Sequence, residues 1–161
     1  YIMVTSFSYA PFYQFSTLEV PDNWAHRRIF FNVPLSEFYA AFKNALQRGY
    51  TVAFDSDIGE PGRMGAEDVA FIPPFDIPHS YINQPARELR FENGSTTDDH
   101  LMHIVGYKNF QGNDWFLVKD SWRTAWAGRF PGYYFFHGDY LKLKALAFLV
   151  NQKAVPEICR R

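Results

Sequence analysis

The chain has 161 residues, the length of one domain, and hydrophobic residues make up 47% of it, enough for a substantial core. Its 16 basic and 17 acidic residues nearly cancel, so the charge gives no reason to expect nucleic acid or a membrane surface as a partner. No apolar run approaches the ~20 residues that are needed to cross a bilayer.

The chain contains one cysteine, Cys159, so an intramolecular disulfide is excluded. This is compatible with a reducing compartment such as the cytoplasm but does not establish one. The opening residues YIMVTSFSYAPF have neither a charged n-region nor a small-residue cleavage site, so they favour a strand over a signal peptide. A secretion signal on a preceding segment stays open, as does whether Tyr1 is the natural start.

The first part of the chain predicts irregular aromatic structure followed by one helix. Residues 1–31 are rich in aromatic side chains and interrupted by turn signals. In the stretch NVPLSEFYAAFKNALQRG that follows, apolar residues recur at helical spacing. Asn32 or Ser36 could cap this helix and Gly49 could end it. The pattern predicts the main helix at about residues 35–48.

The rest of the chain predicts strands and one long loop. Residues 59–94 contain five prolines and several glycines, which is typical of a functional or mobile loop. The segments that favour strands are residues 50–57, 101–107, 114–120, 131–140 and 145–150. The sequence therefore predicts a single domain of the α+β class, with one main helix and a mainly antiparallel sheet of half-barrel character.

The predicted hairpin brings candidate functional residues together. TDDHLMHIVGY and WFLVKDSWR form its two strands, and a turn centred near Phe110 would place His100 opposite Asp120. Directly opposed residues have Cβ atoms ~4.5–5.5 Å apart, so the imidazole and the carboxylate could hydrogen-bond. Trp122 could cover this contact and shield it from water. A purely structural His–Asp pair with ordinary aromatic packing is the alternative.

His103 is separated from His100 by an odd number of residues, so on a strand the two side chains point to opposite faces. A metal site that uses Asp98, Asp99, His100 and His103 stays an alternative, but two histidines in HLMH would need a helix to converge. The continuation Ile-Val-Gly-Tyr argues against a helix. We therefore expect no metal or other cofactor, and a local packing role for His103.

A histidine that a carboxylate orients is two thirds of a nucleophilic triad, and the missing third is the nucleophile. Ser121 adjoins Asp120 but would point to the other face. Cys159 lies in the terminal PEICRR, where two arginines could lower the pKa of its thiol. A frayed tail rarely holds a nucleophile in place, so we expect none in this chain.

At these residues the sequence resembles the papain-like cysteine peptidases. DHLMHIVGY resembles the histidine motif of that family, and VKDSWR resembles its Lys-Asn-Ser-Trp-Gly motif. The stretches EVPDNW, NVPLSEF, ALQRGYTVAFDSDIGE and GYYFF…DYLKLK…VNQKAVP are further similar to the C-terminal half of the bleomycin hydrolase or aminopeptidase C branch. The resemblance covers nearly the whole chain and implies that residues 1–161 form a papain-like right-hand domain.

The resemblance also implies an activity and roles for three residues. His100 would be the general base or imidazolium partner, Asp120 would orient it, and Trp122 would be the shielding lid over a site that cleaves peptides as an aminopeptidase. The nucleophilic cysteine would come from an N-terminal half, on the same precursor or on a second chain. The chain alone is expected to be inactive. Many members of the branch are hexamers, so a homo-oligomer stays open.

The sequence departs from the family at two positions of the site. Asp120 stands in place of an asparagine, and Arg123 stands in place of a glycine and could crowd the lid. An aspartate can still accept the imidazole hydrogen bond. The alternative function is a catalytically inactive pseudo-peptidase fragment that acts as a binding or assembly module. Residues 1–15 would then form part of an exposed apolar face, unless they are a buried strand.

Overall fold

The computed structural model of the chain describes residues 1–160. Its strands are β1 (Ile2–Thr5), β2 (Gln14–Ser16), β3 (Phe30–Asn32), β4 (Val52–Ser56), β5 (Arg63–Met64), β6 (Val69–Ala70), β7 (His100–Phe110), β8 (Asn113–Lys119), β9 (Tyr133–His137) and β10 (Ala145–Val150). Its α-helices are α1 (Leu35–Gln47), α2 (Gln84–Glu92), α3 (Gly138–Lys144) and α4 (Pro156–Cys159). Its 3-10 helices are η1 (Pro21–Asn23), η2 (Gly65–Glu67), η3 (His79–Tyr81), η4 (Arg123–Trp126) and η5 (Gln152–Ala154). No helix in this part of the chain is both long enough and apolar enough to span a membrane.

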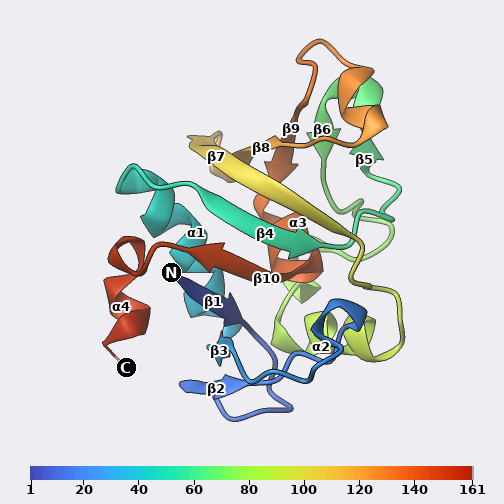
Figure 1. Ribbon diagram of the computed structural model, residues 1–161. Helices are drawn as coiled ribbons and strands as arrows, with labels where there is room; N and C mark the ends of the chain where they lie inside the picture. Colours follow the sequence, from blue (N-terminus) through green and yellow to red (C-terminus); the bar gives the residue numbers. More distant parts are fainter. Residues whose placement is uncertain (161) are drawn as a thin grey trace.

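The strands form one twisted sheet in the order β2-β3-β1-β10-β4-β7-β8-β9-β6-β5 (Figure 1). All pairings are antiparallel except β1 with β3 and β6 with β9. β1 pairs with β10, so the first and last strands of the chain are neighbours within the sheet. The predicted α+β class with a mainly antiparallel sheet is confirmed.

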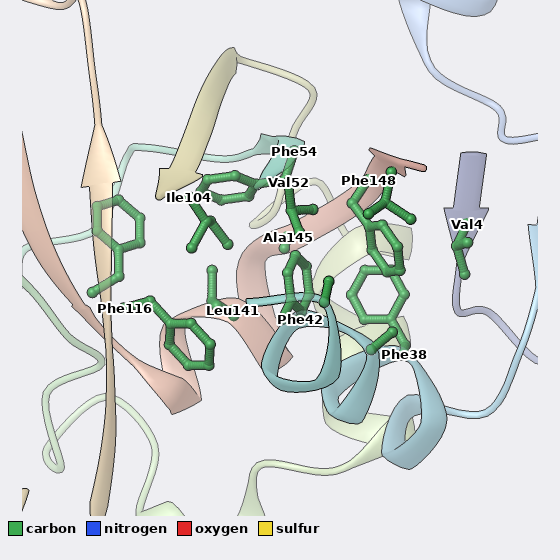
Figure 2. Packing of buried hydrophobic residues seen from close by; sticks show 14 of the residues in the cluster. Val4, Phe38, Phe42, Val52, Phe54, Ile104, Phe116, Leu141, Ala145 and Phe148 are labelled. Carbon is green, nitrogen blue, oxygen red and sulfur yellow. The ribbon is translucent and has the colours of Figure 1, made fainter. Parts of the chain in front are cut away.

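The core lies between α1 and one face of the sheet (Figure 2). Phe38 and Phe42 project from α1 toward Phe148 of β10, with ring centroids 5.0 Å and 4.7 Å from it. The helical spacing of apolar residues therefore gave the correct helix, which ends where Gly49 adopts a φ of 80°. Neither predicted cap, Asn32 or Ser36, is used. The residue before α1 is Pro34, Ser36 lies inside the helix, and the Asn32 side chain bonds to the backbone of residues 7–11.

The prediction of one long loop at residues 59–94 was wrong, because this segment contains β5, β6 and α2. Asn83 caps α2 by accepting a hydrogen bond from the amide of Ala86. α2 gives little apolar signal, since its fully buried side chain is Arg87, which stacks on Phe7 and Phe38. Arg87 donates hydrogen bonds to three backbone carbonyls, and a charged side chain in this role cannot be recognised from apolar periodicity.

Two other predicted segments also differ from the structure. The strand expected at residues 131–140 ends at His137, and the chain then enters α3, whose Tyr140 and Leu141 are buried. Residues 1–31 are less irregular than predicted, because they supply β1, β2 and most of β3. β1 is a mostly buried strand, whereas Phe15 of β2 is half exposed.

Candidate active site

The long β7–β8 hairpin carries the candidate site, in a register that differs from the predicted one by three residues next to the turn and by two beyond an irregularity between Ile104 and Gly106. His103 pairs with Lys119, and the hairpin turns at Gln111 and Gly112, both with positive φ. His100 is therefore not directly opposite Asp120, as the sequence had suggested, but pairs with Ser56 of β4 on its other side. Because a two-residue turn with positive φ at both positions suits the twist of the strands, it sets this register.

The structure nevertheless brings His100 and Asp120 together. Asp120 directly follows β8, and its Oδ1 lies 2.7 Å from Nε2 of His100. The Asp120 side chain is completely buried and that of His100 is 15% exposed. Because Nε2 faces a carboxylate, we assign the imidazole proton to Nε2. Nδ1 then has its lone pair available, and no group within residues 1–160 bonds to it.

Two further donors hold the Asp120 carboxylate. The backbone amide of Trp122 donates to Oδ1 over 2.8 Å, and Nη2 of Arg63 donates to Oδ2 over 2.7 Å. Burial alone would raise the pKa of Asp120. The bonds from the Trp122 amide, from His100 and from Arg63 outweigh that effect and hold the pKa below its ordinary value. Asp120 is therefore a carboxylate that accepts three hydrogen bonds.

Arg63 is the member of this site that the sequence analysis missed. It lies in EPGRMG, a stretch rich in glycine and proline, where an arginine is ordinarily exposed. Its side chain is only 7% exposed in the structure. The one indirect signal in the sequence is Asp120, because a carboxylate next to a buried strand needs a cation nearby. That signal does not say which arginine or lysine supplies it.

Trp122 packs edge-on against His100, with ring centroids 5.7 Å apart and an interplanar angle of 70°. Trp122 is 51% exposed, so it covers the imidazole of His100 only in part. Arg123 follows as the first residue of η4 and is exposed.

The residues of the alternative metal site do not converge. His103 is exposed and its Nε2 lies 2.8 Å from the hydroxyl of Thr51, on the face opposite His100. Asp99 accepts a hydrogen bond from Thr97, and Asp98 accepts one from the amide of Asp22. In residues 1–160 there is no group of three or more His, Cys, Asp or Glu side chains that could hold a metal ion.

Cys159 does not complete the site. It belongs to α4, which lies at the opposite side of the molecule from the N-terminal end of β7, where His100 begins the strand (Figure 1). The thiol is near the carbonyl of Gln152, at 3.7 Å, and burial raises its pKa above the ordinary value. A thiol with a raised pKa is a poor nucleophile at neutral pH.

Comparison with known proteins supports a papain-like relationship over the middle of the chain. The family described as papain family cysteine protease matches residues 86–141, which include His100, Asp120 and Trp122 but not Arg63 or Cys159. Peptidase 1 of Dermatophagoides pteronyssinus is 34% identical over 59 residues, which are 37% of this chain and 18% of that protein. Peptidase 1 of Euroglyphus maynei is 31% identical over 62 residues, 38% of this chain and 19% of that protein.

Among solved structures, PepW from Lactobacillus rhamnosis HN001 shares the fold over nearly the whole chain. The TM-score is 0.72 at 16% sequence identity, and the superposition covers 99% of this chain and 36% of PepW. The chain thus spans about a third of the length of PepW and less than a fifth of the two curated relatives. The chain therefore has the fold of part of PepW and, over residues 86–141, resembles the papain family of cysteine proteases.

Proposed function

We propose that this chain is the histidine-bearing part of a cysteine peptidase, and that a polypeptide segment outside residues 1–161 supplies the nucleophilic thiol. The observation that carries the proposal is the contact between His100 and Asp120, which uses Nε2 and leaves Nδ1 of the imidazole open. The contact lies in the segment that resembles the papain family.

The geometry fits the proton transfers that peptide hydrolysis by a thiol requires. Nδ1 of His100 accepts the proton of the thiol and later delivers it to the departing amine. Asp120, bonded to Nε2, keeps the ring in the correct orientation and tautomer throughout. Trp122 shields one side of the imidazole, which limits competition from water for the hydrogen bond to Asp120.

A groove lies on the face of the sheet opposite His100, and His100, Asp120 and Trp122 do not line it. Its volume is about 510 Å³, and its lining is mostly apolar. Leu101 of β7 and Leu149 of β10 both belong to this lining. Leu101 is 68% exposed and Leu149 is 40% exposed. An apolar groove of this size can hold side chains of a bound polypeptide, but its place away from His100 supports the binding alternative and not the peptidase.

Within the cysteine peptidases, we propose the bleomycin hydrolase or aminopeptidase C branch, with removal of residues from the N-terminus of peptides. The order and spacing of the motifs along nearly the whole chain support this finer assignment. The alternative is a pseudo-peptidase module whose groove binds a partner without cleaving it, and it predicts the opposite outcome in the test below.

The test is native mass spectrometry of the protein as isolated, after treatment with a thiol-directed epoxide. We expect the label on a cysteine outside residues 1–161, either in a longer precursor or in a second polypeptide that stays associated. His100→Ala should slow labelling by ~10²–10⁴-fold, the usual contribution of a general base. His103→Ala is the matched control on the same strand and should label at the parental rate. An assembly without a labelled cysteine would contradict the peptidase and favour the binding module.

A further inference from the structure

The environment of Arg63 explains how an aspartate can occupy the histidine-orienting position. Nη2 of Arg63 lies 2.7 Å from Oδ2 of Asp120, and the two side chains are 7% and 0% exposed. Nη1 of the same guanidinium donates to Oγ1 of Thr124 over 2.9 Å. Because Nη1 and Nη2 are both hydrogen-bonded, the guanidinium has one orientation. Its charge lies against Oδ2 of Asp120, the oxygen that does not contact His100.

A second set of contacts fixes the guanidinium from its flat side. Its Cζ lies 4.7 Å from the ring centroid of Tyr134, within the range of a cation–π interaction. The hydroxyl of Tyr134 donates to Oγ1 of Thr124, the same oxygen that accepts from Arg63. Tyr134 and Thr124 thus hold the arginine by its face and by its edge.

The segment that carries Arg63 is itself fastened to the segment that carries Trp122. A Cβ atom at Gly65 would collide with the carbonyl of Thr124, so only glycine permits this close approach. Asp68 accepts hydrogen bonds from the amides of Arg129, at 2.7 Å, and Phe130, at 3.1 Å. In Figure 1 these two segments lie side by side at the upper right, in green and orange.

The donor pattern shows why the two residues belong together. An asparagine at position 120 could still accept from His100 through its oxygen. Its amide group would then face the guanidinium of Arg63, and both groups are donors. Conversely, a buried aspartate without Arg63 would leave one oxygen and a full negative charge unpaired. The aspartate with its arginine thus leaves neither oxygen at position 120 unpaired, although Nε of Arg63 is buried without a partner in residues 1–160.

We propose that Arg63 is a positioning residue whose charge cancels that of Asp120, so that His100 meets an almost neutral acceptor in place of an unopposed carboxylate. Arg63 is the only cationic side chain other than His100 in residues 1–160 that bonds to the Asp120 carboxylate. The inference rests on the proposed role of His100, and it assigns to Asp120 and Arg63 together the work that a single amide does elsewhere.

The test measures the protonation state and tautomer of His100 by ¹⁵N NMR of the imidazole at one fixed pH near neutrality. An unopposed charge at this distance changes a protonation equilibrium by ~10-fold or more. We therefore expect Arg63→Met to raise the ratio of imidazolium to imidazole at His100 by at least ~10-fold. Arg63→Lys, which keeps the charge, should stay near the parent, and so should Arg123→Met, which removes an exposed arginine nearby.

The double variant Arg63→Met with Asp120→Asn decides the matter. If charge cancellation is the role of Arg63, this variant restores a neutral acceptor, and its His100 signal returns to within ~2-fold of the parent. If Arg63→Met does not fold, the double variant still folds and still gives the parental signal. A parental signal in folded Arg63→Met, or a double variant that remains altered or unfolded, would overturn the inference. These signals need no catalysis, so they are independent of whether a cysteine outside the chain is ever labelled.

Discussion

Lys144 offers the sharpest test of how the core supports the site. It ends α3, is 2% exposed, and its Nζ is the meeting point of two chain segments. It forms ion pairs with Asp57, at 3.3 Å, and Glu60, at 2.8 Å, and donates to the carbonyl of Ser95 over 2.6 Å. The first two residues precede β5, and Ser95 precedes the strand that begins with His100. One buried cation therefore joins the two segments that lead into the site.

The expected cost of Lys144→Met follows from these contacts. Methionine preserves most of the apolar volume but leaves Asp57 without a cation and Glu60 with Arg90 alone among residues 1–160. Removing one partner of a buried ion pair costs ~3–5 kcal/mol, and the remaining bonds of Asp57 and Glu60 keep the loss near that range. For a chain of this length, such a loss lowers Tm by roughly 6–20 °C. Lys153 is exposed, so Lys153→Met should stay within ~0.5 kcal/mol of the parent.

Urea denaturation of the two variants measures this difference, and amide hydrogen exchange locates it. We expect faster exchange in Lys144→Met at residues 57–60 and 95–99, because these segments lose their common anchor. Adding Asp57→Asn to Lys144→Met should recover part of the free energy of unfolding, since the buried charge that has lost its cation disappears. Equal stability of Lys144→Met and Lys153→Met, or exchange that is unchanged in both segments, would refute the assignment of Lys144 as their anchor.

Three further substitutions test other parts of the structure. Burial raises the pKa of Asp55 from 3.8 to about 8, together with the hydrogen bond that its protonated form donates to Asp98. Between these two pH values the folded state holds a proton that the unfolded chain has lost. The free energy of unfolding should therefore fall as pH rises from about 4 to about 8. Asp55→Asn should flatten this pH dependence in urea titrations. A Cβ atom at Gly128 would collide with the Asp68 carboxylate, so Gly128→Ala should cost ~1–3 kcal/mol by thermal unfolding. His103→Ala removes one exposed side chain and should change the free energy of unfolding by no more than ~0.5 kcal/mol.

The parts of the fold that sequence reasoning predicted are those in which neighbours along the chain decide the structure. The spacing of Phe38, Ala41, Phe42 and Ala45 identifies the inner face of α1, since these residues pack on the sheet together. Alternation on a strand likewise separates His100 from His103, which lie on opposite faces of β7. The β7–β8 register was wrong by three residues near the turn, because the turn had been centred too early, and by two near His103, because of an irregularity between Ile104 and Gly106.

The parts that sequence reasoning could not predict depend on contacts between distant segments. Arg63 and Asp120 are 57 positions apart, and no local pattern joins them. α2 was missed because its buried side chain is Arg87, which satisfies three carbonyls where an apolar residue would be expected. In both cases a buried charge stands in for an apolar contact, and hydrophobic periodicity carries no information about such residues.

This has a consequence for how Asp120 is interpreted. In the resemblance to the papain-like peptidases, an aspartate in place of asparagine at position 120 is a departure that the sequence alone leaves ambiguous. In the structure, Asp120 has a buried cation on one oxygen and two donors on the other, and the imidazole keeps the free nitrogen that proton transfer needs. The substitution at position 120 therefore cannot be judged without Arg63. Under the proposed function, an aspartate at position 120 is therefore no argument against activity, and the test is whether a thiol reaches Nδ1 of His100.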